Sequence, residues 1–227
     1  MQRLAGVFQD HRAAILRSAG VVILLSISIV FLWRGLRAPG EPPPSDRPLK
    51  AEVIRAISGH KLKLETDEYV VYAGIRSLYE YEDKDLSEKA LHRNTELVEG
   101  KEVRLRFDQA GRNREGHLLA YVFVEGELVN ETLVREGLAY VRLTATTQRF
   151  AERLLAAQVE ARHRKRGLWK EKITATERSY VGDPKYGNFH RPGCEELTRK
   201  PPERLKTLKS KSRAFQAGFA PCVKCRP

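Results

Sequence analysis

Short runs of alternating apolar and polar residues recur through the centre of the chain. Such alternation is typical of strands that bury one face and expose the other. The runs lie at residues 53–57, 62–64, 69–73, 102–107 and 118–124. A turn at Ser58-Gly59-His60 separates the first two, and the last run ends at Glu125-Gly126. We therefore predict five short strands.

Longer stretches with helical spacing of apolar residues separate these strands. The pattern predicts one helix over residues 86–97, a second that starts at Glu131 with Asn130 as its cap, and a third over residues 147–166. The third ends at the run 167–169, Gly-Leu-Trp. Five short strands with interspersed helices suit a Greek-key barrel of the OB type, which makes the domain mostly β with added α.

The front of the chain has a different pattern. Residues 18–33 carry no charge and are bounded by Arg17 and Arg34. A helix of this length spans roughly 24 Å, and it approaches the hydrocarbon core of about 30 Å if residues 13–16 extend it while Arg17 reaches the headgroups. We predict a transmembrane anchor over residues 18–34 after a short tail, residues 1–17. A cleaved signal peptide and a buried soluble helix are the alternatives.

Basic residues flank the predicted anchor on both sides, so their distribution does not fix its orientation. A short tail before a large domain resembles the bacterial signal-anchor arrangement. We therefore expect a single-pass protein of the bacterial inner membrane with an extracytoplasmic body. The proline-rich residues 35–48 form an extended linker, and the folded domain begins at residue 49.

The charge balance adds a prediction about partners. The chain of 227 residues is 41% hydrophobic, which suffices for a core, and carries a formal charge of +12. From Glu171 onward, 13 Lys and Arg stand against 6 Asp and Glu, so +7 of this charge lies in the last quarter. A basic face of this kind attracts nucleic acid or another polyanion, whereas the alternative is a charged surface without a partner.

All three cysteines lie near the C-terminus, in two short motifs. His190-x-x-x-Cys194 and Cys222-x-x-Cys225 together supply three thiols and one imidazole. This set is typical of a closed, structural Zn²⁺ site, so we predict a Cys3His zinc module over residues 178–227. A Cys222–Cys225 or Cys194–Cys222 disulfide with one free thiol is the alternative. The module resembles the small Ada-like metal-binding modules found behind some bacterial thermonuclease domains.

Four motifs of the central region resemble the staphylococcal nuclease (thermonuclease) family. Residues 116–122, GHLLAYV, match its G-R-x-L-A-Y-V strand, and residues 129–139 match its V-N-x-x-L-V-x-x-G-L-A helix. Residues 100–105 resemble its G-K-x-V-x-L strand and residues 164–169 its closing G-L-W. The resemblance covers residues 49–170 in order, and it implies the OB-type barrel already predicted from the pattern.

The same resemblance implies a catalytic set that this sequence lacks. The family cleaves phosphodiester bonds with one calcium ion, two aspartates, a glutamate and two arginines. Here His60 and Arg76 replace the aspartates, Tyr79 the glutamate, and Val71 and His117 the arginines. All five positions depart from the family, and a cation at position 76 would repel calcium. We therefore expect no Ca²⁺ and no catalytic residues.

Two other groupings could supply function instead. His60, Arg76 and His117 could converge on a cationic pocket that holds phosphate, with Arg112 and Arg114 in the turn before His117. Alternatively, an acidic cluster could serve a relocated nuclease site, although carboxylates also suit a solvated loop and helix start. This cluster comprises Glu80, Glu82, Asp83 and Asp85.

These observations favour a membrane-tethered, non-catalytic protein that binds nucleic acid or another polyanion. Tyrosines of the barrel could stack on bases of a single strand. They are Tyr69, Tyr72, Tyr79 and Tyr81. Two alternatives stay open: an active metal-dependent phosphodiesterase or endonuclease with a relocated site, and an envelope interaction scaffold that meets anionic lipid.

Overall fold

The computed structural model of the chain describes residues 48–171 and 173–227. The predicted tail and anchor, and the predicted linker up to residue 47, lie outside the described residues. Within residues 48–171 and 173–227, no helix is both long and apolar enough to cross a membrane.

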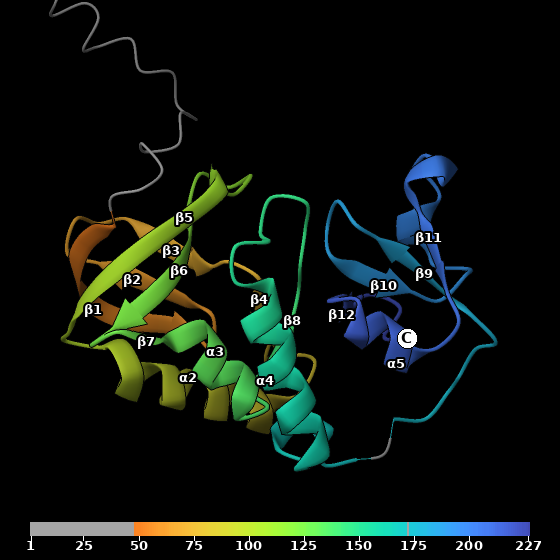
Figure 1. The fold of residues 1–227 in the computed structure, drawn as a ribbon, viewed down its shortest axis with the longest axis horizontal. Coiled ribbons are helices and arrows are strands. Elements are labelled where there is room, and N and C mark those ends of the chain that lie inside the picture. The colour runs from red at the N-terminus through yellow and green to blue at the C-terminus, as the bar shows by residue number, and fades with distance from the viewer. Residues whose placement is uncertain (1–47, 172) are drawn as a thin grey trace, which may run out of the picture. The chain divides into compact units, whose positions relative to one another are not determined.

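Five strands form a closed barrel, as predicted (Figure 1). The sheet order is β3-β2-β1-β5-β6-β7, and parallel pairing of β3 with β6 closes it. Inward-facing residues alternate with exposed ones, as in β5, where Val103, Leu105 and Phe107 are buried. The five barrel strands are β1 (Leu49–Ser58), β2 (Lys61–Leu64), β3 (Tyr69–Tyr72), β5 (Glu102–Arg112) and β6 (Leu118–Val124), and the two-residue β7 (Glu127–Leu128) extends the sheet beyond β6.

A separate pair of short strands lies beside the barrel. β4 (Ile75–Ser77) pairs antiparallel with β8 (Ala139–Val141), and Arg76 stands opposite Tyr140. All three residues of β4 are buried. This pairing carries position 76 away from the barrel sheet and toward the C-terminal part of the chain.

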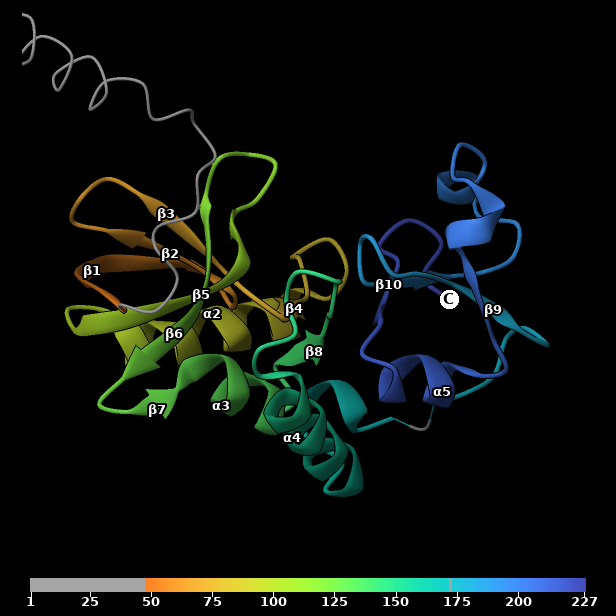
Figure 2. The ribbon, with the colours of Figure 1, turned by 45° about the horizontal axis from the view of Figure 1, so that its top comes forward.

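Helices α2 (Lys84–Val98), α3 (Val129–Arg135) and α4 (Ala151–His163) lie along one side of the barrel (Figure 2). The helix predicted at residues 86–97 is present and two residues longer at its start, where Asp83 accepts a bond from the Leu86 N–H at 3.0 Å. The helix predicted from residue 147 begins at Ala151. The cause is Asp108, whose carboxylate accepts from two backbone N–H groups in the preceding turn, at residues 148 and 149.

The predicted capping role of Asn130 is wrong. Asn130 lies inside α3 and is fully buried. Its side chain accepts from the Val122 N–H at 2.9 Å and donates to the Ala73 carbonyl at 2.8 Å. Asn130 therefore ties two barrel segments to the helix, because buried backbone groups at both places need a partner.

The C-terminal segment forms a second small sheet of order β11-β9-β10-β12 with one helix. β10 and β12 lie next to each other (Figure 1), and their parallel pairing sets Phe189 opposite Pro221, so the next residues of the chain, His190 and Cys222, come side by side. The elements are β9 (Tyr180–Asp183), β10 (Asn188–His190), β11 (Lys206–Leu208), β12 (Ala220–Pro221) and α5 (Lys211–Gln216), with single 3-10 turns at Gly167–Trp169, Glu195–Leu197 and Pro202–Arg204.

An aromatic cluster joins this C-terminal module to the barrel. Phe215 of α5 contacts Trp169 at 4.9 Å and Tyr140 at 5.7 Å between ring centroids. Gln158 of α4 accepts from the Val141 N–H and donates to the Phe215 carbonyl, both at 2.9 Å. The module therefore shares a hydrophobic core with the last helix of the barrel.

A glycine permits a second close contact between the two parts. Gly218 has φ of 77°, and its carbonyl accepts from the Leu143 N–H at 2.8 Å. A Cβ at this position would lie 2.6 Å from Leu143 Cδ1. Only glycine combines this backbone conformation with such a close approach.

Candidate functional site

Arg76 of β4 lies where the resemblance implies a calcium ligand of the family, and we call the surroundings of this residue the Arg76 corner. Its side chain is only 2% exposed. Nη1 lies 2.6 Å from Glu82 Oε2, and Nη2 donates to the Pro221 carbonyl at 3.1 Å. Glu82 Oε2 also accepts from the Tyr79 N–H at 3.0 Å. The guanidinium thus forms a buried ion pair with one residue of the acidic cluster and a bond to the C-terminal module.

His60 lies in the same corner and is buried. Its Nδ1 lies 2.7 Å from Ser77 Oγ, and its ring meets Tyr79 edge to face at 6.0 Å. Burial, together with the positive charges of Arg142, Arg76 and Lys61, lowers the pKa of His60 to about 3. The imidazole is therefore neutral at physiological pH and adds no positive charge to the corner.

These side chains do not fit a calcium ion. Calcium takes six to eight oxygen ligands, chiefly from carboxylates and carbonyls. The corner offers a guanidinium at position 76, a neutral imidazole at position 60 and a phenol at position 79. The nearby carboxylate of Glu82 is already paired with Arg76. The corner is thus a closed hydrogen-bonded arrangement of protein groups.

The five residues predicted to bind phosphate do not all lie together in the structure. His60 and Arg76 lie together, as above. His117 stacks edge to face on Tyr69 at 5.3 Å, at the other end of β3. Tyr72, whose N–H donates to the His60 carbonyl, is three residues from Tyr69, which is about 10 Å along a strand. The described contacts therefore do not bring His117 together with His60 and Arg76, because strand register places the two histidines beside opposite ends of β3.

The remaining two predicted residues also have partners. Arg112 makes a two-bonded ion pair with Glu68, at 2.8 and 3.0 Å. Arg114 lies over the ring of Tyr186 at 4.6 Å and so reaches the C-terminal module. Val71, the fifth replaced family position, is a β3 residue paired with Lys61.

The acidic cluster is used mainly for structure. Glu82 pairs with Arg76, and Asp83 caps α2. Both line a cavity of about 480 Å³ that also includes Asp85 and, from the module, Cys222 and Arg226. The cavity therefore adjoins both the Arg76 corner and the cysteine cluster.

His190, Cys194, Cys222 and Cys225 come together in the module. Their candidate ligand atoms all lie within 4.8 Å of one another, and the first three residues are buried. His190 Nδ1 lies 3.5 Å from Cys194 Sγ, and the Arg191 N–H lies 3.4 Å from Cys225 Sγ. This group could hold a metal ion. The three cysteines are free, so neither of the alternative disulfides is present.

The environment of the thiols differs within the cluster. Burial opposes ionisation of Cys222, but hydrogen bonds from His190 and from the backbone N–H groups of Cys225 and Lys224 outweigh it and lower the pKa of this thiol to about 6. Burial and the neighbouring Cys222 raise the pKa of Cys225. The low pKa of Cys222 favours its thiolate, which is the form of cysteine that binds metal ions.

Comparison with known proteins bears on the barrel. The sequence model of the family described as staphylococcal nuclease homologue matches residues 69–171. These residues form a staphylococcal nuclease-like domain. The match begins at β3, passes through the Arg76 corner and the α3 and α4 helices, and ends just after the Gly-Leu-Trp turn.

Three curated relatives resemble this nuclease-like domain. The SPbeta prophage-derived endonuclease YokF of Bacillus subtilis is 36% identical over 97 residues, 42% of this chain and 33% of its own length. Endonuclease YncB of Bacillus subtilis is likewise 36% identical over 97 residues, covering 46% of its length. The thermonuclease of Staphylococcus intermedius is 23% identical over 163 residues, 67% of this chain and 97% of its length. The chain thus spans between a third and a half of the first two relatives.

Sequence reasoning missed the groups that lock the nuclease-like domain to the module. The Pro221 carbonyl carries no side-chain signal, and Gln158 lies in an ordinary helical pattern.

A buried charge inside the module was also missed. Asp183 is fully buried beside Lys200 and Arg204, at 2.8 and 3.4 Å. Its position in a strand followed by Pro184 was the one signal that could have marked a buried charge at a tight turn.

Proposed function

We propose that this chain is a membrane-tethered protein that binds nucleic acid through a nuclease-like barrel without cleaving it. The relatives are named as endonucleases and thermonucleases, which act on nucleic acids. A formal charge of +12 provides the attraction for phosphates. The alternatives are an active enzyme with a relocated site and an envelope scaffold.

The buried Arg76–Glu82 pair is the observation that carries the proposal. A cation takes the position that binds a cation in the family, and its partner carboxylate comes from the acidic cluster that a relocated site would need. Asp83 is committed to capping α2. A rebuilt metal site would have to separate a buried ion pair, which costs about 3–5 kcal/mol.

The module is proposed to hold a structural zinc ion. Three thiolates and one imidazole are the soft donors that zinc prefers over calcium or magnesium, and a set of four leaves no position open for a substrate. The separation limit of 4.8 Å among these atoms is compatible with tetrahedral ligation at about 2.3 Å from sulfur. The resemblance to Ada-like modules stays a prediction.

Membrane tethering rests on the uncharged residues 18–33 and the flanking arginines. We propose a single anchor over residues 18–34 with an extracytoplasmic body in the bacterial inner membrane. Fractionation of cells followed by protease protection of the intact chain tests both parts. Recovery in the soluble fraction would reject the anchor, and protection of the body in spheroplasts would reject its extracytoplasmic orientation.

A digestion assay tests the absence of cleavage. The purified full-length chain is incubated with single-stranded DNA and RNA in calcium, in magnesium and in chelator, beside a staphylococcal thermonuclease as positive control. We expect intact substrate in every condition and a mobility shift that weakens as salt rises. Cleavage that requires a metal and disappears in Glu80→Gln or Asp85→Asn would instead establish a relocated site. Binding to anionic vesicles without binding to oligonucleotides would favour the scaffold.

A further inference from the structure

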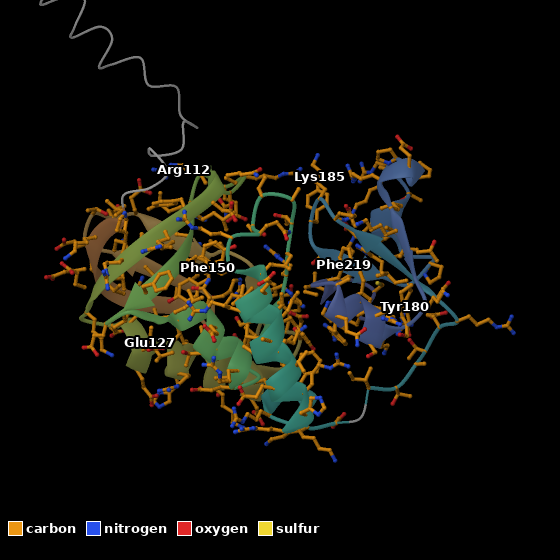
Figure 3. All side chains as sticks on the ribbon, in the orientation of Figure 1. Arg112, Glu127, Phe150, Tyr180, Lys185 and Phe219 are labelled. Atoms are coloured by element: carbon orange, nitrogen blue, oxygen red, sulfur yellow. The ribbon has the colours of Figure 1, made fainter. Side chains whose placement is uncertain are left out.

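Four cationic side chains gather around the ring of Tyr186. Arg114 comes from the β5–β6 turn of the barrel and lies 4.6 Å from the ring centroid. Lys185 (Figure 3) belongs to the β9–β10 turn of the module, as does Tyr186. Lys200 and Arg204 lie 4.8 and 5.9 Å from the same ring. The positive charges around Tyr186 therefore come from three chain segments, one in the barrel and two in the module.

A buried carboxylate organises part of this cluster. Asp183 is fully buried, and it pairs with Lys200 at 2.8 Å and with Arg204 at 3.4 Å. It also accepts the Lys185 N–H at 3.1 Å. Although burial disfavours the charged form, these contacts lower the pKa of Asp183 below its ordinary value. Asp183 therefore neutralises one of the two cations it holds and fixes the turn that carries Lys185 and Tyr186.

Two cations of the cluster, and the neighbouring Arg199, have no such partner. Among the residues that the structure describes, no carboxylate pairs with Arg114, Lys185 or Arg199, and all three are exposed. Lys185 and Arg199 line a cavity of about 460 Å³ together with Tyr186, Lys200 and Arg204. The remaining lining residues are Glu195, Glu196, Thr198 and Lys224, of which both glutamates pair with Lys224.

The cavity lining therefore combines an aromatic ring with an excess of positive charge, since five cations stand against two glutamates. Bringing like charges together raises the free energy of the folded chain unless an anion neutralises them. Lysine and arginine heads at a concave surface suit phosphate oxygens, which accept several charge-assisted hydrogen bonds. Neither His60 nor Arg76 is available for this purpose, because both are buried and bonded within the nuclease-like domain.

We infer that the Tyr186 pocket of the module, together with Arg114 of the nuclease-like domain beside it, binds phosphate groups of the nucleic-acid backbone. The inference rests on the proposed function and specifies where the strand is held. Arg114 contacts the strand from the barrel, and Lys185 and Arg199 contact it from the module. The metal module thus contributes directly to binding.

Charge reversal at the pocket tests this inference on the full-length chain. Binding of a labelled single-stranded DNA oligonucleotide is measured by fluorescence anisotropy across a salt series. We expect Lys185→Glu with Arg199→Glu to raise Kd at least about tenfold and to reduce the salt slope by about 1.4, since each single-strand phosphate contact contributes about 0.7. Arg114→Gln should reduce the slope by about 0.7.

A matched control separates the pocket from overall charge. Arg178→Glu with Lys209→Glu changes the net charge equally, at exposed module residues that do not line the cavity. This control should retain nearly the original Kd and slope. Equal weakening by both double variants would overturn the pocket while leaving nucleic-acid binding in place. Absence of oligonucleotide binding by the unmodified chain would overturn the proposed function and the pocket together.

The same anisotropy assay tests whether another anion is the preferred ligand of the pocket. Inorganic phosphate at millimolar concentration should compete only weakly, because one phosphate recovers few of the contacts that a strand makes. If phosphate alone displaces the oligonucleotide fully, or if anionic vesicles bind more tightly than DNA in a Lys185-dependent manner, the pocket serves a different anion and the inference is rejected. Circular dichroism of each variant confirms that the fold is retained.

Discussion

The carbonyl of Pro221 accepts a hydrogen bond from Arg76 Nη2 at 3.1 Å. Pro221 immediately precedes Cys222. The Arg226 guanidinium adds a bond to the Tyr81 carbonyl, 3.0 Å away, in the loop that follows β4. The cysteine-bearing end of the module is therefore attached to β4 and the loop that follows it.

The Arg76–Glu82 pair is expected to be essential for stability. Glu82→Gln leaves the buried guanidinium without its counter-charge and should lower the free energy of unfolding by about 3–5 kcal/mol, measured by urea denaturation. Arg76→Met combined with Glu82→Met should cost much less than the two single changes together. As a control, Lys50→Ala breaks an exposed pair with Glu102 and should cost less than about 1 kcal/mol. A Glu82→Gln cost as small as this would contradict the buried pair.

His60 should make stability fall in mild acid. Its pKa is about 3 in the folded chain, against an ordinary value of 6.5. Between these values the unfolded chain takes up a proton that the folded chain does not, so the free energy of unfolding decreases as pH falls from 6.5 toward 3, by up to about 1.4 kcal/mol per pH unit. Between pH 7 and pH 5 the unmodified chain should therefore lose about 2 kcal/mol more than His60→Gln.

The control for this pH effect is His92→Gln. His92 is exposed on α2 beside Glu96, and its replacement should leave the pH dependence of the unmodified chain intact. Urea denaturation at both pH values gives the two differences. An identical loss in His60→Gln and in the unmodified chain would show that the folded chain accepts a proton at His60.

Asn130 is expected to hold the barrel to α3. Asn130→Leu removes the partners of the Val122 N–H and the Ala73 carbonyl, and it should lower the free energy of unfolding by about 2–4 kcal/mol. Asn113 makes comparable bonds in the exposed turn before His117, where water can replace them. Asn113→Ala should therefore cost about 1 kcal/mol or less, and equal costs would contradict the buried role of Asn130.

The four-residue cluster should retain one zinc ion per chain through purification. Elemental analysis should find zinc in the unmodified chain and lose it in Cys194→Ser and Cys222→Ser. Removing one of four ligands should weaken zinc binding by about 3 kcal/mol, roughly a quarter of the about 10–16 kcal/mol typical of structural sites. A module residue outside the cluster supplies the control, because Ser212→Ala should keep the full zinc content. Zinc absent from the unmodified chain, with a disulfide found by mass spectrometry, would reject the site.

The barrel could be predicted from sequence because its signals are local. Alternation marks each strand, and the turn at residues 58–60 marks the hairpin between the first two. The cysteine cluster was likewise predictable, since local spacing forms each ligand pair and all three cysteines of the chain belong to the two pairs. The role of Asn130 was not, because a helix-capping residue and a buried bridging residue have the same sequence context.

The separation of His117 from His60 and Arg76 could not be predicted for a different physical reason. Whether His60 and His117 meet depends on the register of β3 against β6, which pairs Val70 with Leu118. Parallel pairing of strands far apart in sequence leaves no local signal. The same holds for Arg114, whose contact with Tyr186 joins turns of two different parts of the fold.

The bridge that Gln158 makes between Val141 and Phe215 limits how this architecture can be recombined. One amide side chain satisfies backbone groups on both sides of the junction, and Phe215 packs on the rings of Trp169 and Tyr140. A gene that lost the module by truncation would encode a barrel with an exposed aromatic surface and an unpaired amide. Exchange of either part between related genes would succeed only with matching changes in α4 and α5, so the two parts are expected to be inherited as one evolutionary unit.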